Sequence, residues 1–284
     1  MVNAPYWIVH VSALVGAILV GWGWQAFAWL LGGYLVRAFA ISATYHRYFS
    51  HRTFKTSRAF QFVLAVLGMT CAQQGPLWWA AHHRRHHKHA DDPQDLHSPR
   101  QGGFVWAHVR WVLSARYQKT DYDRIRDFAA YPELQWLNDH DALFVIGSAV
   151  LLLLIGGPTA LVWGFFVALV ASWHATFVIN SLAHVWGKRR YATDDDSRNN
   201  ALLAVLTLGE GWHNNHHHYQ RSSRLGFRWW QIDLTYYVLR VFSWLGLIWD
   251  LEVVPRHVRD EAPSPARTRL AGPTTEPAAS SVVP

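Results

Sequence analysis

The sequence predicts an all-α integral membrane protein, with four transmembrane helices in two hairpins and a helical cap on one face of the bilayer. Two stretches of the chain, residues 1–36 and 142–187, contain no Asp, Glu, Lys or Arg. A charged side chain at the bilayer centre costs about 3 kcal/mol or more, so long charge-free apolar stretches are typical of membrane spans. One span takes about 20 residues, so each stretch has room for two. The low share of charged residues, 16%, agrees with this class.

Each charge-free stretch is interrupted once by residues that end helices. The tripeptide Gly-Trp-Gly at 21–23 divides the first stretch, and Gly-Gly-Pro at 156–158 divides the second. Gly and Pro interrupt helices, and Trp favours the membrane–water interface. We therefore expect two helical hairpins with short, uncharged connections. The expected spans are residues 6–21, 24–45, 142–156 and 159–185.

The Lys and Arg residues all lie in the two long polar segments, between and after the charge-free stretches. Segments rich in Lys and Arg stay on the cytoplasmic side of a membrane, so we expect both polar segments and both termini there. The membrane domain would comprise residues 1–254, with the cap formed by 46–140 and 188–254. Residues 255–284 are rich in Pro, Ala, Ser and Thr and offer little apolar surface to pack, so we expect a disordered tail.

Two further apolar segments need an assignment. Residues 59–83 could form a fifth span, but we prefer an interfacial or half-buried helix, because a fifth span would place the histidine clusters on opposite sides of the membrane. The segment after Arg221, which contains RWWQIDLTYYVLRVFSWLGLIWDL, is rich in Trp and Tyr. It predicts an amphipathic helix at the membrane interface.

The chain contains 18 histidines, and they cluster in four places. On a helix, residues i, i+3 and i+4 share one face, so each HxxHH motif is expected to direct three imidazoles to one point. The five-residue gap of HRYFSH does not fit one helix face and suggests a helix end that frays into a loop. The candidate ligands are His46 and His51, then His83, His86 and His87, then Asn180 and His184, and finally His213, His216 and His217.

Taken singly, each cluster has an ordinary explanation, such as a solvated basic stretch, a packed core histidine or a polar loop. Their recurrence on four elements argues against these explanations. A nucleic-acid patch would need more Lys and Arg than imidazole and would not need a histidine in an apolar span, so we expect no nucleic acid partner. Nine imidazoles exceed the four to six ligands of one ion, which implies two metals. The single Cys71 excludes a cysteine-based zinc site.

The series HxxxxH, HxxHH, NxxxH and HxxHH, interleaved with two hairpins, resembles the membrane fatty acid desaturases, and most of all the stearoyl-CoA Δ9 type. The phrase WWAAHHRRHHKHADDPQDLHS is similar to their second histidine box, LGEGWHNNHHHY to their third, and FVINSLAH to the end of their fourth span. The resemblance covers roughly residues 20 to 250. Any one box would be unspecific, but jointly the motifs are very specific.

The resemblance implies a di-iron oxygenase that uses O2 to place a cis double bond in a long-chain fatty acyl chain. An acyl-CoA substrate and the Δ9 position are expected. Electrons would come from a separate ferredoxin or a cytochrome b5-like carrier with its reductase. The nine histidines above would be the iron ligands, Asn180 would approach one iron through water, and no catalytic residue is expected beyond these. Trp78 and Trp79 would line the acyl tunnel or anchor the chain at the interface.

Some features leave alternatives open. His82 and His218 offer shifted registers for the second and third boxes, and Asp95-Leu96-His97 stands where the family has Asp-Pro-His. A membrane di-iron hydroxylase or an acyl-lipid desaturase would share the metal core, although hydroxylases more often use HxxxH at the first box. A non-catalytic metal transporter or sensor would want ionisable residues on several spans. The apolar stretches contain only three, His10, His174 and His184.

Overall fold

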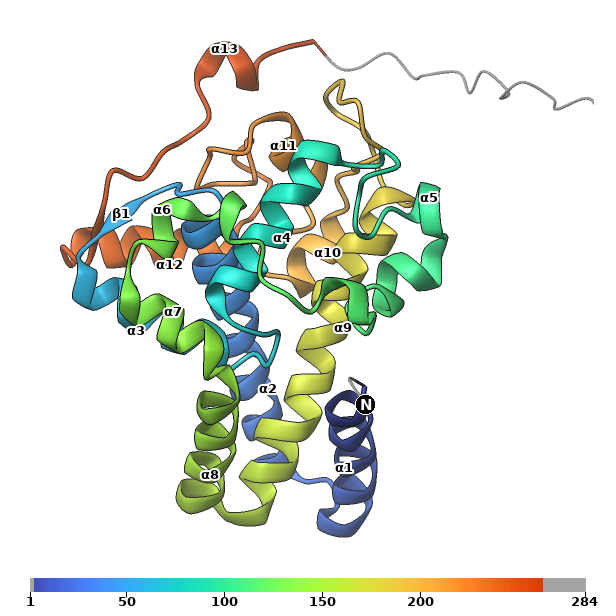
Figure 1. Ribbon diagram of the computed structural model, residues 1–284, viewed down its shortest axis with the longest axis vertical. Coiled ribbons are helices and arrows are strands. Elements are labelled where there is room, and N and C mark those ends of the chain that lie inside the picture. Colours follow the sequence, from blue (N-terminus) through green and yellow to red (C-terminus); the bar gives the residue numbers. More distant parts are fainter. Residues whose placement is uncertain (1–2, 263–284) are drawn as a thin grey trace, which may run out of the picture.

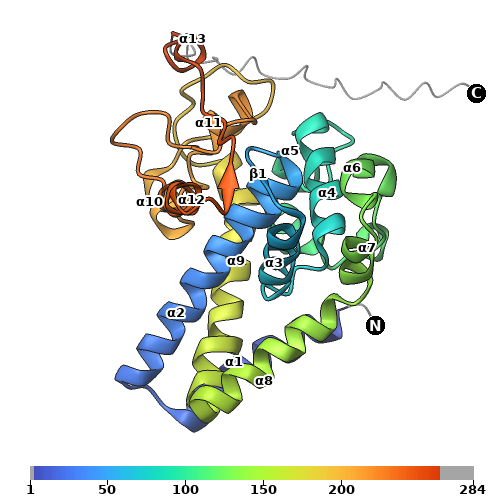
Figure 2. The same ribbon diagram turned by 90° about the vertical axis from the view of Figure 1, so that its left-hand side faces the viewer.

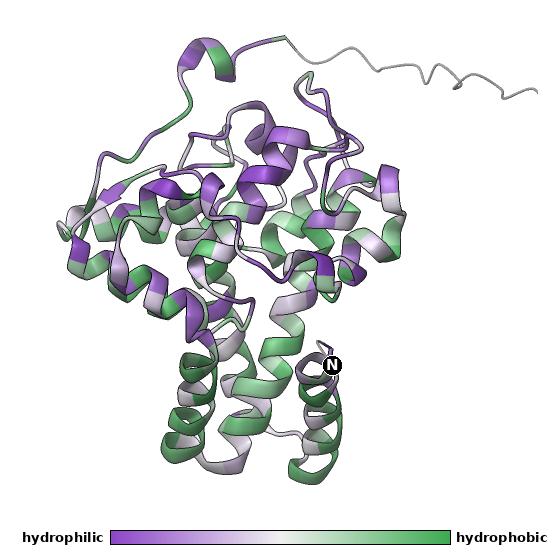
Figure 3. Cartoon of the chain, in the orientation of Figure 1, coloured by the Kyte–Doolittle hydropathy of each residue, from purple (hydrophilic) through white to green (hydrophobic). Residues whose placement is uncertain are grey.

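The computed structural model describes residues 3–262, which form helices with one small pair of strands. Four apolar helical rods project from a broad polar body, which comprises residues 51–140 and 185–262 (Figures 1 and 3). The strands β1 (Lys55–Thr56) and β2 (Ile248–Trp249) pair antiparallel, with Lys55 opposite Trp249. The prediction of a mostly helical chain is therefore confirmed.

The four rods follow the charge-free stretches. Two continuous segments are long and apolar enough to cross a membrane, Trp24–Ser50 and Asp141–His184, and the second turns back on itself at Gly157. Gly21 and Gly157 have positive φ angles of 75° and 64°, which glycine adopts without a steric penalty. The rods consist of α1 (Ala4–Val20), α2 (Trp24–Ala40) with the π-helix η1 (Ile41–Ser50), α8 (Asp141–Thr159), and the π-helix η5 (Ala160–Val167) with α9 (Ala168–Ser181) and the 3₁₀ turn η6 (Leu182–His184).

The rods pack closely where small residues meet. A Cβ on Gly33 of α2 would clash with the carbonyl oxygen of Gly164 in η5, and a Cβ on Gly16 of α1 would lie 2.8 Å from Val162. Small residues let helix backbones approach in this way within membranes. The outer faces carry exposed aliphatic side chains, such as Leu19 at 79% exposure. These faces suit a lipid environment.

The polar body surrounds the upper ends of α2 and α9 (Figure 2). Its main core forms where η1, α3, α4 and α7 meet, around Tyr45, Phe49 and Leu77. The elements are α3 (Arg58–Met69), α4 (Pro76–His89), α5 (Pro99–Gly102), η2 (Trp106–Arg110), η3 (Ala115–Tyr117), η4 (Tyr122–Arg124), α6 (Arg126–Ala129), α7 (Pro132–Asp139), α10 (Ala201–Leu206), α11 (His213–His218), α12 (Leu234–Trp244) and α13 (Arg256–Arg259).

The two apolar segments outside the rods both form helices of the polar body. Helix α3 has 12 residues, begins at the N-cap Ser57 and packs on η1, so it is too short to cross a membrane and is half-buried as preferred above. Helix α12 begins at the N-cap Asp233, whose side chain accepts a hydrogen bond from the backbone N–H of Tyr236. It buries Leu239 and exposes Trp244, as expected of an amphipathic helix.

The first eight residues of the expected tail are ordered against the polar body. They contain α13, and Arg228 pairs with Asp260 at 2.9 Å. The Tyr191 hydroxyl donates to the Arg259 carbonyl at 2.8 Å. These polar contacts hold residues 255–262 without an apolar core, which is why composition alone suggested disorder there. Residues 263–284 lie outside the described part of the chain.

Candidate metal centre

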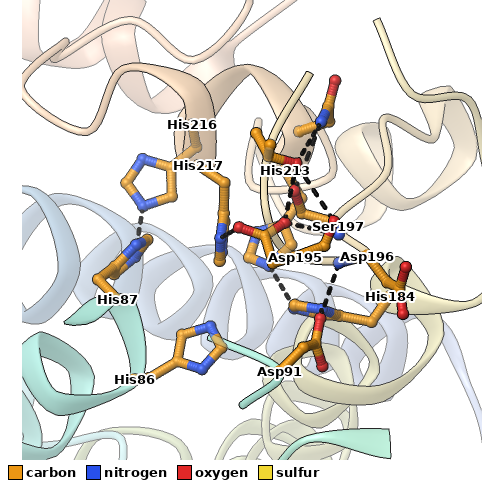
Figure 4. A network of polar contacts seen from close by, with 12 residues as sticks. His86, His87, Asp91, His184, Asp195, Asp196, Ser197, His213, His216 and His217 are labelled. Atoms are coloured by element: carbon orange, nitrogen blue, oxygen red, sulfur yellow. Dashed lines mark hydrogen bonds and ion pairs between the residues drawn. The ribbon is translucent and has the colours of Figure 1, made fainter. Parts of the chain in front are cut away.

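The nine histidines come together as two adjacent groups. Figure 4 shows part of this arrangement, with His86, His87, His184, His213, His216 and His217. Within each group, one nitrogen from every ring lies within 4.8 Å of the others. They arrive on four elements, η1 with the residue after it, α4, η6 and α11. The first group contains His46, His51, His83, His87 and His216, and the second contains His86, His184, His213 and His217.

Each HxxHH motif contributes to both groups, so the expectation that its three imidazoles meet at one point is wrong. In α4, His83 and His87 join the first group while His86 joins the second. In α11 the opposite holds: His213 and His217, four residues apart, join the second group, while His216 joins the first. Residues i and i+4 differ by about 40° around a helix, whereas i+3 lies about 60° away in the other direction. Helices α4 and α11 each therefore connect the two groups.

The first histidine pair lies at the end of a π-helix, with His46 on η1 and His51 as the residue that caps it. The backbone N–H of His51 donates to the carbonyl of His46 at 3.2 Å, which is the five-residue hydrogen bond of a π-helix. This bond places residues five apart on the same face, so both rings reach the first group. All ten residues of η1 are buried. The HxxxxH spacing thus follows from the π-helical backbone.

The spacing of the first group fits a six-coordinate ion. The Nε2 atoms lie 2.9 Å apart in the successive pairs His46–His216, His216–His87, His87–His83 and His83–His51. Two nitrogens each about 2.1 Å from one metal lie about 3.0 Å apart at right angles and about 3.4 Å apart at tetrahedral angles. The observed spacing matches the right-angled arrangement.

The five rings of the first group are arranged as a square pyramid. The centroid of His51 lies within 4.9 Å of the other four centroids. Those four form a closed square, with neighbours 4.4 to 4.6 Å apart. The diagonal between His83 and His216 is longer, at 6.2 Å. These five imidazoles would together hold one metal ion.

The second group offers four imidazoles. The Nε2 atoms of His184 and His213 are 3.0 Å apart. Nε2 of His86 and Nε2 of His217 are buried and have no hydrogen-bond partner within residues 3–262. Buried polar atoms are rarely left unpaired, so these lone pairs fit a metal ion. Asn180 lies beside the group, in a cavity that His86 and His213 also line.

Buried carboxylates hold the other ring nitrogen of four of these histidines. Such partners fix the tautomer and direct Nε2 towards the metal. They were not predicted from the sequence, although two lie in the Asp-rich stretch after the second box and Glu210 lies three residues before the third. The Nδ1–carboxylate contacts are His46–Glu210 at 2.6 Å, His86–Asp95 at 3.0 Å, His184–Asp91 at 2.8 Å and His217–Asp195 at 2.8 Å.

The electrostatics of the two groups suit metal binding. The pKa values of His83, His87 and His213 lie well below the usual histidine value. Burial is the larger cause, and repulsion from neighbouring imidazoles is the second. Burial raises the pKa of Glu210, but His46 and Arg47 outweigh it and lower that pKa to about 2. At neutral pH these imidazoles are therefore neutral and the carboxylate is ionised, which is the state in which both serve a metal.

A cavity reaches both groups from the side of the rods. Its upper wall contains His46, His83, His86 and His213, and its lower walls are faces of α2 and α9. Trp79 lines it and stacks on His83, with 4.8 Å between ring centroids. A chain of hydrogen bonds runs along one wall, from Trp79 Nε1 to Gln73 at 3.4 Å and from Gln73 Nε2 to Thr176 at 3.0 Å.

A family model for fatty acid desaturases matches residues 21–244. This chain belongs to the fatty acid desaturase family. Desaturases of this family are oxidoreductases of lipid metabolism, which confirms the family prediction made from the histidine boxes. The match spans residues 21–36 of the first charge-free stretch, the whole of the second and all nine histidines.

Relatives within the desaturase family resemble this chain over most of their length. The sn-2 palmitoyl-lipid 9-desaturase of Nostoc sp. (strain 36) is 35% identical over 248 residues, which cover 84% of this chain and 85% of the relative. The acyl-CoA C20 Delta5-desaturase of Anemone leveillei is 36% identical, covering 86% and 79%. The sn-1 stearoyl-lipid 9-desaturase of Anabaena variabilis is 34% identical, covering 90% and 94%. The relatives thus include enzymes named for lipid-linked and for CoA-linked chains.

The other histidines near the boxes of this chain lie outside both groups. His82 hydrogen-bonds through Nδ1 to the Trp78 carbonyl, and His218 contacts Glu261 at 3.1 Å. Neither shifted register is therefore used. His97 is buried with its ring 4.3 Å from that of His86, and burial lowers its pKa to about 3.

Trp78 and Trp79, although adjacent, occupy different environments. Trp79 lines the cavity, as described above. The Trp78 side chain is buried against Trp111 and donates from Nε1 to the carbonyl of Tyr117 at 2.7 Å. Trp78 therefore neither lines the cavity nor lies at an exposed interface.

Proposed function

We propose that this protein introduces a cis double bond into a long-chain fatty acyl chain, using O2 and a di-iron centre held by nine histidines. The observation that carries the proposal is the convergence of the histidines into one group of five and one of four, within a fatty acid desaturase. Asn180 would approach the iron of the second group through water.

Iron fits the first group better than zinc does. Structural and catalytic zinc sites are almost always tetrahedral, with four or fewer protein ligands. Five imidazoles with right-angled spacing suit an octahedral ion with one free position. When bound, two irons would supply the O2 activation that removal of hydrogen from an unactivated methylene requires.

The overall reaction balances with one external source of electrons. Two hydrogen atoms leave adjacent methylenes, and O2 is reduced to two waters. The four electrons come in equal numbers from the two C–H bonds and from a separate ferredoxin or a cytochrome b5-like carrier with its reductase, and two protons are added. The role of the protein is to hold one methylene pair beneath the histidines and to keep water and other C–H bonds away. The cavity walls of α2 and α9, with Trp79, perform this role.

We propose an acyl-CoA substrate and the Δ9 position as the finer assignment. Two of the relatives are named as 9-desaturases and one as a Delta5-desaturase, so position nine has the broader support. The carrier is named as lipid in two of them and as CoA in the third. A test of this assignment therefore has to offer both carriers.

We further propose that the four rods cross the membrane as two hairpins and that the polar body is the cytoplasmic cap, with both termini on that side. The parts of the rods that project from the polar body are mainly hydrophobic, whereas the hydrophilic residues gather in the polar body (Figure 3). All Lys and Arg except Arg37 and Arg47 lie in the polar body or the terminal residues beyond it. The electron donor would then dock from the cytoplasm.

The test measures iron and lipids in the same preparation. Cells express the wild-type protein or the His86→Ala variant together with a ferredoxin, a cytochrome b5 and their reductases. We expect two irons per wild-type chain after anaerobic purification and a new monounsaturated chain that is absent with the variant. Membranes then receive stearoyl-CoA or a stearoyl lipid separately, and the product shows the carrier and the bond position. A hydroxylated product would move the protein to the related hydroxylases. Absence of iron with unchanged lipids would favour the metal transporter or sensor.

A further inference from the structure

Arg37 is a buried cation in the wall of the cavity. It lies on α2, is 3% exposed, and forms no ion pair with any described acidic residue. Its Nη1 donates to the carbonyls of Gly33 at 3.1 Å and Gly164 at 2.8 Å, and its Nε donates to that of Thr70 at 3.1 Å. Its Nη2 has no hydrogen-bond partner in residues 3–262. A buried ionisable group in an apolar span points to a function, because its burial is costly.

Arg37 lies at the end of the cavity remote from the histidines. The residues of α2 that line the cavity begin with Arg37, and those of α9 begin with Ser172. Arg37 precedes His46 by nine residues, which corresponds to about 13 Å along a helix. Ser172 precedes Asn180 by eight residues, or about 12 Å. Along both walls, the cavity therefore extends about 12 to 13 Å from the metal centre to the level of the Arg37 guanidinium.

The surroundings of Arg37 indicate which part of an acyl substrate would lie at this end of the cavity. Arg37 packs there against the rods, with its guanidinium carbon 5.3 Å from the centre of the Phe165 ring and its Nη1 bonded to the Gly164 carbonyl. This end lies between the apolar helices α2 and α9, where a large polar CoA or glycerolipid head group would be costly to bury, so we place the methyl end of the acyl chain towards Arg37. The free N–H groups of Nη2 need water or another acceptor, and a hydrocarbon chain pressed against them would leave them unpaired.

We propose that Arg37 is a specificity-determining residue that limits the length of the acyl chain between the new double bond and the methyl end. Chains that stop short of Nη2 leave its hydration intact, whereas each longer chain has to remove that hydration. The inference rests on the proposed desaturase function. It adds that the charge of Arg37, and not only a steric barrier, sets the upper limit on the length of the acyl chain.

The experiment measures a ratio of products, which does not depend on the amount of folded protein. Cells that express each variant receive equal amounts of saturated acids with sixteen, eighteen and twenty carbons, and the unsaturated products are quantified. We expect Arg37→Met to raise the ratio of twenty-carbon to sixteen-carbon product about tenfold, which corresponds to about 1.4 kcal/mol. Arg37→Lys retains the charge and should stay within about twofold of wild type.

Two further variants allow for the structural role of the Arg37 hydrogen bonds. Arg37→Gln keeps a donor for the Gly164 carbonyl and should shift the ratio in the same direction as Arg37→Met, if that variant does not accumulate. Ala38→Leu adds bulk to the same end of the cavity and should lower the ratio about tenfold. Unchanged ratios in the neutral variants, with unsaturated products still formed, would overturn the inference alone. A wild-type protein that forms no unsaturated product of any length would overturn the proposed function as well.

Discussion

Two histidine assemblies in this molecule invite comparison. The nine histidines of the candidate metal centre direct Nε2 inwards, and four of them present Nδ1 to carboxylates. A second assembly joins α1, α9 and η2 through His10, His174 and His108. There, Nε2 of His10 lies 3.3 Å from Nε2 of His174, and Nδ1 of His174 lies 3.0 Å from Nε2 of His108.

The difference lies in where the ring nitrogens find their partners. In the second assembly, His10 donates from Nδ1 to the Tyr6 carbonyl at 2.8 Å, so its Nε2 must accept from His174. By the same reasoning, His174 accepts from His108. The Nδ1 atom of His108 lies 3.0 Å from the Ser181 hydroxyl, which donates to the Phe177 carbonyl at 2.8 Å. Every ring nitrogen of these three residues lies within 3.3 Å of a polar atom, and no group of lone pairs converges among them. A histidine cluster thus indicates a metal site when carboxylates hold one nitrogen and leave the other free.

Loss of a converging histidine should have the largest effect. In the His216→Ala variant, the first group keeps four imidazoles and loses one corner of its square. We expect iron to fall from about two to about one per chain and product formation to fall by more than about 100-fold. Iron analysis and lipid profiles measure both quantities. His174→Ala is the matched control, and equal iron loss in that variant would contradict the distinction between the assemblies.

Loss of a carboxylate partner should have a smaller effect of the same kind. Asp195→Asn leaves the His217 ring in place but removes the acceptor that fixes its tautomer. Such partners typically contribute about 10- to 100-fold in metal affinity or activity. Competition with a chelator measures the affinity. The matched control is Asp92→Asn, since Asp92 pairs with His89 outside both groups. An iron affinity of Asp195→Asn equal to that of wild type would show that the carboxylates do not orient the ligands.

Acid should destabilise the metal-free protein. The pKa values of His51, His83 and His216 are lowered in the folded state by burial, so the neutral rings favour folding. This stability is present above the unfolded histidine pKa of about 6.5 and is lost as pH falls towards the lower folded values. Melting temperatures of chelator-treated protein between about pH 7.5 and about pH 5.5 should therefore decrease on acidification. The iron-loaded protein should change less, and a flat profile without metal would be inconsistent with buried neutral rings.

Interruption of the second assembly should have the smallest effect. His174→Phe removes two hydrogen bonds while keeping an aromatic ring between α1 and η2. Each bond contributes about 1 kcal/mol, so the free energy of unfolding should decrease by about 1 to 2 kcal/mol, with iron content unchanged. Denaturant titration and iron analysis check the two parts. Loss of iron here would imply that this assembly also binds metal.

The sequence alone predicted the features that depend on neighbouring residues. The helix breaks at Gly21 and Gly157 were predicted from residue type, because a left-handed backbone favours glycine. The spacings of the histidine boxes were also readable, and they led to the family. These features depend on chain periodicity and steric freedom, which act over a few residues.

Only the tertiary structure decided how the site is assembled. Whether His86 or His87 faces a given group depends on the position of α11, which is far away in the sequence. Asp91 reaches His184 across 93 residues, so no local spacing marks it as a partner. The π-helix that aligns His46 with His51 is selected by the packing of its ten buried residues. A histidine offers two nitrogens and several rotamers, and contacts between distant elements decide which of them meets the metal.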